Sequence, residues 1–336
     1  MRLATRCTLR CNIVLWAAVC LLPRSAPAQE LVTDLRITTL STMLTELRGV
    51  GEWGYAALVE TNQGTFLFDT GERPDTVLRN AGELGIDLGA VEDVVLTHHH
   101  FDHTGGLVTL RSDLRARNPA TMSRTHVGEG MFLPRQIDSA ALARLPIQPP
   151  AELLVSVLHV KSKYEELGGR FVVHDSPQEL APGIWVTGPI PRLYPEKNWT
   201  QFEQIESAGQ LIEDNIPEDL AMVIDTPKGL IVVVGCGHAG VVNTLEYARE
   251  IVPGKPIHAV IGGFHLLNQT DDQIAWSGQK MRELGVKHVI GAHCTGINAV
   301  EGLRAAADLT RETSVVGAVG TVFTLDKGIQ AGMLNR

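Results

Sequence analysis

The chain has 336 residues, of which 44% are hydrophobic and only 5% aromatic, and it contains 33 glycines. This composition suits one large, loop-rich α/β protein and excludes a coiled coil or a disordered chain. The formal net charge of −9 argues against nucleic acid as a partner, because binding to phosphates requires a basic surface.

The first 28 residues have the pattern of an export signal. The start of the chain carries only positive charge, and the apolar run from Ile13 to Leu22 is too short to span a bilayer. The small-x-small sequence A-P-A at 26–28 then supplies a cleavage site. We expect a signal peptide at 1–28, a periplasmic or secreted mature chain over 29–336, and no membrane association after cleavage. An uncleaved N-terminal anchor is the alternative.

Secondary structure in the first part of the chain follows from apolar spacing and turn residues. Apolar runs on either side of Asn62–Gly64 predict a hairpin. The apolar spacing across 75–84 predicts a helix that Gly85 ends. The sequence VEDVVLT predicts a short buried strand, and GGLVTLR a helix soon after it. Open α/β sheets bind ligands where such strands end.

Residues 111–182 lack a regular pattern and include the strand- and helix-breaking sequence RLPIQPPAE, so we expect an insertion or lid there. A second hairpin is predicted to turn at 227–229, and a helix follows it over AGVVNTLEYAREIV. Three more short strands are expected in IHAVIGGFH, KHVIGAHC and TVFTL, with helices between them. The chain thus repeats a layout of hairpin, helix, strand and loop in two halves.

The sequence THHHFDH, directly after the VEDVVL run, carries the strongest functional signal. In an extended loop, residues two apart point the same way, so His98 and His100 are suited to hold one ion. Asp102 and His103 lie where the chain turns into a helix and are suited to face a second ion. Imidazole favours zinc, iron or nickel, and the carboxylate adds tolerance for manganese. His99 alternates away from these ligands, so we expect it to pack or to support them.

Three later histidines follow predicted strands in glycine-rich sequence. We expect His238 and His293 to be metal ligands, and His265 to be either a ligand or a substrate contact. Asp69 ends the first hairpin and is expected to hydrogen-bond a ligating imidazole or its turn; a simple turn residue is the alternative. The other histidines after the leader, His126 among them, are expected to be structural, with membership of the lid as the alternative for His126.

Two cysteines and two arginines complete the candidate set. Cys236 and Cys294 are the cysteines that follow the leader, and a disulfide is one expectation in an exported protein. Because both adjoin histidines in motif-like sequence, we favour free cysteines that support the site. Arg192, in PIPR, and Arg135, in FLPR, are expected to help set substrate choice, and Arg192 is a candidate for binding a phosphate or carboxylate of the substrate. A solvated arginine at the surface is the alternative for Arg192.

FDTG and THHHFDHTGG together resemble the metallo-β-lactamase superfamily. The sequences VTGPIPR, LIVVVGCGHAGVVNTL, AVIGGFHLL and GAHCTG resemble its branch of dihydropterin ribofuranosyl-aminobenzene 5'-phosphate synthase-like proteins. The resemblance implies a single domain folded as a four-layer αββα sandwich around a dinuclear metal centre. It places one metal on His98 and His100, another on Asp102 and His103, and completes both shells with the remaining expected ligands, His238 and His293.

Two departures from the family pattern bear on this centre. Many members carry an aspartate that bridges the metals after the second-half strand, where this chain reads Gly235-Cys236-Gly237-His238. The bridge is then a water or hydroxide alone, or His238 or Cys236 binds in its place. His99 also stands where branch members commonly have glycine.

The resulting functional expectation is an exported metal-dependent hydrolase. A metal-bound hydroxide would attack a small-molecule ester, lactone, lactam or phosphoester, with Asp102 and His265 as catalytic groups. The expected cofactors are two divalent ions, with zinc favoured over manganese and iron. An iron-dependent redox enzyme on the same fold, or a non-catalytic metal-binding protein, is the alternative. The branch name denotes a step in making an intracellular cofactor, which fits an exported chain poorly.

Overall fold

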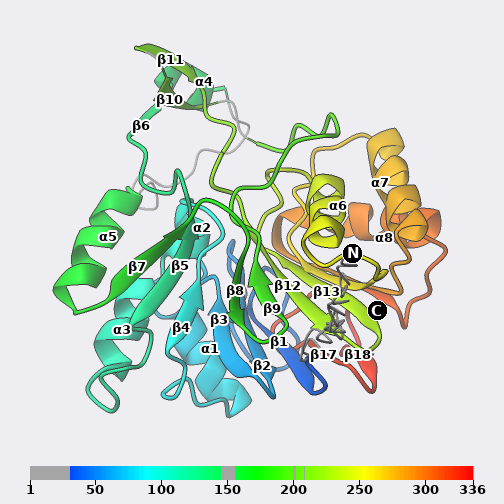
Figure 1. Ribbon diagram of the computed structural model, residues 1–336, viewed down its shortest axis with the longest axis horizontal. Coiled ribbons are helices and arrows are strands. Elements are labelled where there is room, and N and C mark those ends of the chain that lie inside the picture. The colour runs from blue at the N-terminus through cyan, green and yellow to red at the C-terminus, as the bar shows by residue number, and fades with distance from the viewer. Residues whose placement is uncertain (1–30, 145–155, 200–201, 208, 336) are drawn as a thin grey trace, which may run out of the picture.

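A computed structural model describes residues 31–144, 156–199, 202–207 and 209–335 (Figure 1). The expected signal peptide at 1–28 lies outside the described residues. Within them, none of the helices combines the length and the apolar character that crossing a membrane requires.

The first β-sheet has eight strands in the order β18-β17-β1-β2-β3-β4-β5-β7. The hairpin predicted around Asn62 is confirmed as β2 and β3, and β3, β4, β5 and β7 then run parallel. The strands are β1 (Leu35–Ser41), β2 (Ala56–Thr61), β3 (Gly64–Phe68), β4 (Asp93–Val95), β5 (Arg124–Gly128), β7 (Arg170–His174), β17 (Val322–Thr324) and β18 (Gly328–Gln330).

The second β-sheet has seven strands in the order β16-β15-β14-β13-β12-β9-β8. The second predicted hairpin is confirmed as β12 and β13, and β13 to β16 run parallel. The strands are β8 (Gln178–Ala181), β9 (Ile184–Val186), β12 (Ala221–Thr226), β13 (Gly229–Val234), β14 (Ile257–Gly262), β15 (His288–Gly291) and β16 (Ser314–Val316).

Helices cover the outer face of each sheet. In Figure 1, α3 and α5 lie on one side of the molecule and α6, α7 and α8 on the other. The helix predicted over 75–84 is confirmed: it begins after Asp75 and ends at Gly85, which adopts a left-handed φ of 72°. These helices are α1 (Thr76–Leu84), α3 (Leu107–Leu114), α5 (Val157–Glu166), α6 (Val241–Ile251), α7 (Asp271–Glu283) and α8 (Ile297–Ala306).

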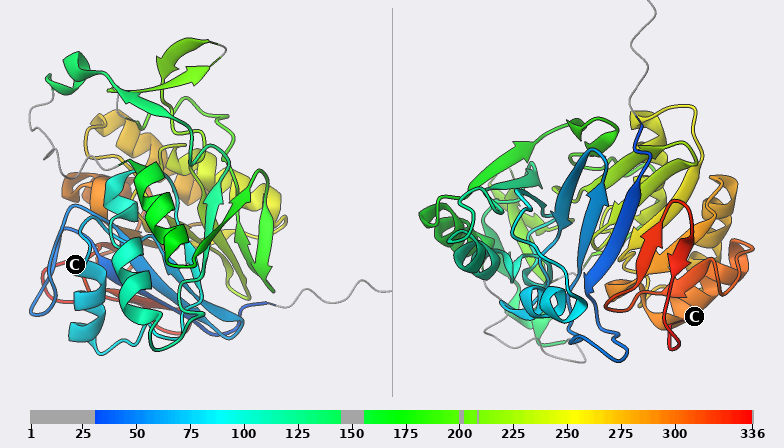
Figure 2. Two further views of the ribbon diagram at one scale, coloured as in Figure 1. Left: turned by 90° about the vertical axis from the view of Figure 1, so that its left-hand side faces the viewer. Right: turned by 90° about the horizontal axis from the view of Figure 1, so that it is seen from below.

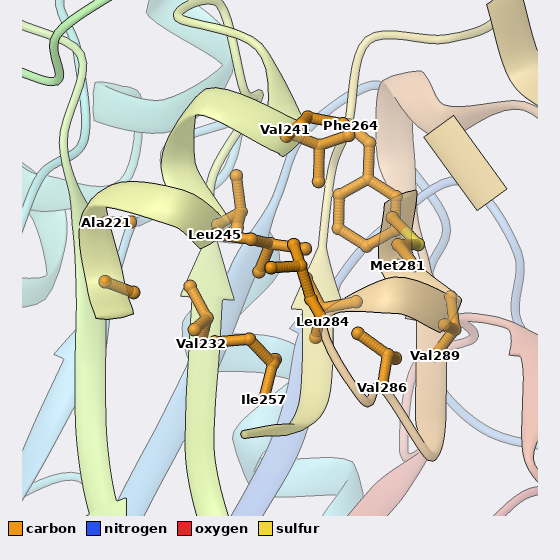
Figure 3. Close-up of a cluster of buried hydrophobic side chains, with 14 of the residues drawn as sticks. Ala221, Val232, Val241, Leu245, Ile257, Phe264, Met281, Leu284, Val286 and Val289 are labelled. Carbon is orange, nitrogen blue, oxygen red and sulfur yellow. The ribbon is translucent and has the colours of Figure 1, made fainter. Parts of the chain in front are cut away.

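The apolar side chains form three buried layers, which the alternation of the strands explains. In β13, Ile231 and Val233 face the first sheet, whereas Val232 and Val234 face the helices. Figure 3 shows this outer layer, where Val232 lies near Leu245 of α6. A strand that is buried on both faces reads as a continuous apolar run, as GLIVVV does. The predicted four-layer αββα sandwich is therefore confirmed, and Figure 2 shows its sheets from two further sides.

The insertion expected at 111–182 is smaller than predicted. β5 and β7 are strands of the first sheet, and α3 and α5 pack on its outer face. His126 lies on β5 and is therefore not part of a lid. The sequence did not indicate these two strands, because RTHVG and RFVVH are short and mix charged residues with apolar ones. A separate three-stranded sheet does stand outside the sandwich (Figure 1), and we call it, with α4, the cap; it comprises β6 (Arg135–Ile137), α4 (Ser139–Leu142), β10 (Glu203–Ser207) and β11 (Gln210–Glu213).

Candidate metal centre

The expected ligands meet where strands of both sheets end at their carboxyl termini, as the layout of an α/β sandwich predicts. The loop after β4 carries His98 and His100, and the short helix α2 (Phe101–Thr104) carries the next two candidates, Asp102 and His103. From the second sheet, the chain after β13, β14 and β15 carries the remaining candidates: Cys236, His238, His265, His293 and Cys294.

The first group of converging ligand atoms belongs to His98, His100 and His238, and these atoms lie within 4.8 Å of one another. Nε2 of His98 is 2.9 Å from Nδ1 of His100. Nδ1 of His238 donates to the carbonyl oxygen of Asn198 at 2.5 Å, which leaves Nε2 as the unprotonated nitrogen. That Nε2 is buried and has no hydrogen-bond partner among the described residues. We call these three histidines the first triad.

The second group comprises Asp102, His103 and His293, whose ligand atoms also lie within 4.8 Å of one another. Oδ2 of Asp102 is 3.2 Å from Nε2 of His293 and 3.9 Å from Nε2 of His103. Nε2 of His103 and both ring nitrogens of His293 are buried without a hydrogen-bond partner in the part of the chain that the structure describes. We call this group the second triad.

Asp69 supports the second triad from behind. Its Oδ2 accepts a hydrogen bond from Nδ1 of His103 at 2.7 Å, so the contact expected from the sequence is present. The carboxylate also accepts from the backbone N–H and the hydroxyl of Thr97. Asp69 itself holds a left-handed φ of 55°, a conformation that aspartate tolerates better than most residues. These contacts fix the His103 ring with Nε2 toward Asp102.

The electrostatics of both triads fit divalent cations. Burial, and then the neighbouring imidazoles, lower the pKa of His98 and of His238 well below its usual range, so both rings are neutral, which is the form in which imidazole binds a cation. Burial would also lower the pKa of His293, but Cys294 and Asp102 outweigh it and raise the pKa to about 10. A cation in the second triad would supply the positive charge that this proton otherwise brings to Asp102. Neutral imidazoles with unpaired nitrogens, together with a carboxylate, match the donors that zinc and similar ions take.

Cys236 and His265 lie beside the triads rather than within them. Sγ of Cys236 is within 4.8 Å of ligand atoms of His98 and His103, at the place where the sequence left the bridging group open. His265 is half-buried, its ring centroid lies 4.6 Å from that of His238, and its Nδ1 is 3.1 Å from Sγ of Cys236. Cys236 and Cys294 are both free and buried, so the disulfide considered from the sequence is not present.

His99 points away from both triads, as its position between the ligands predicts. Its Nδ1 lies 2.7 Å from Oε1 of Glu218, and its Nε2 lies 3.2 Å from Oε2 of Glu203 in the cap. The same Glu203 oxygen is 3.0 Å from Nε2 of His100. Burial would lower the pKa of His99, but the two carboxylates raise it to about 9. This network ties the cap to His100 of the first triad.

The two candidate arginines are held by protein groups. Arg135 pairs with Glu218 at 2.7 Å and with Asp214 at 2.6 Å, which joins the cap to the loop before β12. Arg192 donates from Nη2 to the backbone carbonyls of Asn215 and Ile216. Its Nε is buried and has no hydrogen-bond partner among the described residues.

Three contacts at the site were not indicated by any pattern in the sequence. Glu203 holds His100, the carbonyl of Asn198 fixes the His238 ring, and the Trp53 ring lies 5.3 Å from the His293 ring. Glu203 and Asn198 occur in turn-rich or charged sequence with no motif spacing, so no pattern marked them. Trp53 lies next to the first predicted hairpin. The chain has only 5 tryptophans, and this rarity was the one feature of the sequence that could have drawn attention to Trp53.

A family model described as the metallo-beta-lactamase superfamily matches residues 54–254. The chain belongs to the metallo-beta-lactamase superfamily. The match includes the first triad, Asp102 and His103, while His293 lies beyond its end. The resemblance on which the sequence analysis relied is thereby confirmed.

Among relatives, this superfamily member is 32% identical over 246 residues to 7,8-dihydropterin-6-methyl-4-(beta-D-ribofuranosyl)-aminobenzene-5'-phosphate synthase of Methanocaldococcus jannaschii, covering 72% of this chain and 79% of the relative. A solved structure described as Tm1679, a metal-dependent hydrolase of the beta-lactamase superfamily, superposes with a TM-score of 0.66 at 26% identity, covering 86% and 98% of the two chains. The Zn(2+)-bound PqqB from Methylobacterium extorquens shares the fold, with a TM-score of 0.50, 13% identity and coverage of 86% and 99%.

Proposed function

We propose that this member of the superfamily is a metal-dependent hydrolase of small-molecule esters, lactones, lactams or phosphoesters. The observation that carries the proposal is the pair of adjoining triads, in which buried ring nitrogens of His103, His238 and His293 have no hydrogen-bond partner among the described residues. Unpaired buried nitrogens are costly in a folded protein unless they serve a ligand.

The ligand atoms of the two triads indicate which residues hold each ion. His98, His100 and His238 hold one divalent ion, and the second triad holds another, zinc being favoured by the neutral imidazoles. When bound, such ions lower the pKa of coordinated water and polarise a carbonyl or phosphoryl oxygen. The Asp102 carboxylate faces the space between His103 and His293. It orients the attacking water there by accepting a hydrogen bond from that water.

His265 serves the substrate in this scheme. Its Nδ1 is directed at Cys236, which leaves Nε2 as the nitrogen that can meet a substrate. The ring is half-buried, whereas the neighbouring His238 is fully buried. We assign His265 the role of hydrogen-bond donor to the substrate oxygen or leaving group.

The surroundings of the centre favour a small substrate with an apolar part. Trp53 is 41% exposed although its ring contacts that of His293, so an aromatic face borders the second triad. The cap is fastened to His100 through Glu203 and limits the space on the side of the first triad. Nucleic acid is not the proposed substrate, because the chain is acidic.

We also propose that the protein is exported. The leader-like sequence at 1–28 supports a periplasmic or secreted enzyme that leaves the membrane after cleavage. Mass spectrometry of the protein recovered outside the cytoplasm tests this part: a mature chain that begins at Gln29 supports it, and one that still begins at Met1 contradicts it.

A group-transfer reaction is the second candidate, and one observation favours it. The relative that is 32% identical to this chain is called a synthase, so the same centre is compatible with activating a group for transfer rather than for hydrolysis. Iron-dependent redox chemistry and metal storage are further alternatives, and a test must distinguish them from hydrolysis and from group transfer.

The decisive experiment begins with metal analysis of protein purified without added metal. Chromogenic esters, lactones, lactams and phosphodiesters are then screened in ¹⁸O-labelled water, with His238→Ala and the matched variant His174→Ala, which removes a buried histidine of β7. We expect one ¹⁸O in the product, at least about a hundredfold less activity in His238→Ala with loss of metal, and little change in His174→Ala. Product without ¹⁸O indicates transfer, and stoichiometric iron with electron transfer contradicts hydrolysis.

A further inference from the structure

A second set of potential ligands lies beside the two triads, at the ends of three neighbouring parallel strands. Cys236 follows β13, His265 follows β14, and Cys294 follows β15. The three strands pair in that order in the second sheet. The middle strand therefore supplies an imidazole, and the strands on either side supply one thiol each.

The donor atoms of these three residues converge. Sγ of Cys236 lies 2.8 Å from Sγ of Cys294 and 3.1 Å from Nδ1 of His265. The three ligand atoms lie within 4.8 Å of one another. Both cysteines are free, with exposed fractions of 2% and 1%, so two thiols and an imidazole nitrogen meet in a place that solvent hardly reaches.

The backbone is shaped to bring the two thiols together. Neighbouring strands are spaced about 4.8 Å apart, so β13 and β15, with β14 between them, would by themselves keep their ends about 10 Å apart. The chain closes this gap over the end of β14, where Gly263 has no side chain. A Cβ at that position would lie 3.0 Å from Sγ of Cys294 and 2.3 Å from the carbonyl oxygen of Gly235.

His265 adopts a conformation that the surroundings must hold in place. Its φ of 47° lies in the left-handed region, which costs a residue other than glycine on the order of 1 to 3 kcal/mol. Its backbone N–H donates to Sγ of Cys294 at 3.2 Å, while its ring turns to Cys236. One residue thus contacts both sulfur atoms, from its backbone and from its ring.

We propose that Cys236, His265 and Cys294 form a third cation site, selective for a thiophilic ion such as Zn²⁺ or Cu⁺. Two thiolates and one imidazole are donors that soft ions prefer and that magnesium or calcium avoid. Binding releases the two thiol protons to solvent, and the imidazole binds as its neutral form. This inference goes beyond the hydrolytic function and stands without it.

The site links the two triads. Cys236 is two residues before His238 of the first triad, and Cys294 directly follows His293 of the second. An ion held between the cysteines fastens both ligand loops to the end of β14. Cys236 also approaches His98 and His103, whereas Cys294 takes part in no other ligand cluster among the described residues. Cys294 is therefore the residue that reports on the third site alone.

The test uses the full chain with Cys7, Cys11 and Cys20 replaced by serine, so that Cys236 and Cys294 are its only thiols. The metal-free protein, prepared under reducing conditions, is titrated with cadmium. Bound cadmium per chain and the ultraviolet thiolate-to-cadmium charge-transfer band are measured. The variants are Cys294→Ser, His265→Ala and the control His288→Ala, which removes a histidine of β15 from outside the three clusters.

We expect the parent to bind one more cadmium ion than Cys294→Ser, whatever number the two triads hold. The charge-transfer band should fall by at least about half in Cys294→Ser, because one of the two thiolates is lost. His265→Ala should weaken binding of that ion at least about tenfold, while His288→Ala should behave as the parent. Circular dichroism on each variant establishes that it is folded.

Two results overturn the proposal. One is an equal number of bound ions in the folded parent and in folded Cys294→Ser. The other is a thiolate-to-cadmium charge-transfer band that is as strong in folded Cys294→Ser as in the parent. Neither result bears on the hydrolytic assay, so failure of the third site is distinguishable from failure of the proposed function.

Discussion

Oδ2 of Asp69 lies 2.7 Å from Nδ1 of His103, and neither side chain is exposed to solvent. This single hydrogen bond sets which nitrogen of His103 carries the proton. With the proton on Nδ1, the unpaired Nε2 faces Asp102 and is free to bind a cation. The arrangement of the second triad therefore depends on a carboxylate that is not itself a ligand.

Asp69→Asn tests this dependence. The amide can place an N–H opposite Nδ1 of His103, which favours the proton on Nε2 and so blocks the ligand nitrogen. We expect metal affinity of the second triad to fall about 10- to 100-fold, measured by competition with a chromophoric chelator. Asp308→Asn is the matched control, since Asp308 is another aspartate with a left-handed φ, 57°. Equal metal affinity in both variants would refute the role of Asp69.

Glu203 is predicted to fasten the cap. Its carboxylate lies between His99 and His100, whereas Glu206 on the same strand is exposed. In Glu203→Ala, amide hydrogen exchange in 203–213 should accelerate by about tenfold or more, because local opening loses a buried contact. Glu206→Ala should leave that exchange close to the parent. Unchanged protection in Glu203→Ala would show that the cap is held by other contacts.

Glu196 is predicted to make stability depend on pH. Burial raises its pKa to about 7 from an ordinary 4.5, although the N–H groups of Val242 and Asn243 oppose the shift. The folded state then binds this proton more tightly than the unfolded state, so folding free energy is lost as pH rises from about 4.5 to about 7. The loss amounts to up to about 3 kcal/mol.

Urea unfolding of Glu196→Gln at several pH values measures this effect. The variant, which cannot ionise, should lose less stability than the parent between pH 5 and 8. Glu250→Gln, at an exposed position of α6, should follow the parent. A Glu196→Gln profile parallel to that of the parent would rule out the raised pKa.

Removal of bound metal is predicted to lower the melting temperature. A cation bound only by the folded state adds about 4 kcal/mol when its free concentration is a thousand times the Kd, which corresponds to at least about 5 °C in a protein of this size. Scanning calorimetry with and without a chelator measures the change. A double variant, His238→Ala with His293→Ala, should show a smaller chelator effect than the parent, because each triad has lost a ligand and only the third site is intact. A metal-loaded parent that melts at the same temperature after chelation would contradict the prediction.

The sequence predicted the part of the site that is contiguous or follows strands. Four of the candidate ligands lie between His98 and His103, so their spacing in the sequence was enough to group them. His238 and His293 were predicted because each follows a predicted apolar strand in glycine-rich sequence. The β-hairpins were equally clear from the apolar runs on either side of turn residues, whereas the αββα layers were expected from the family resemblance.

The contacts between distant segments were not predictable in this way. Glu203 lies 103 residues beyond His100 in a strand whose sequence, EQIES, is polar and gives no hint of its partner. β5 and β7 lie in the segment for which the sequence predicts an insertion, because the alternation in their short, partly charged sequences is weak. Long-range contacts of this kind depend on chain topology, which single-sequence periodicity does not encode.

Anomalous diffraction from crystals grown with the metal found in the purified protein shows whether the two triads hold cations. We expect one peak about 2.0 to 2.2 Å from the ring nitrogens of His98, His100 and His238, and another at that distance from His103, His293 and the Asp102 carboxylate. Protein that contains stoichiometric metal but gives no anomalous peak at either triad would contradict this expectation.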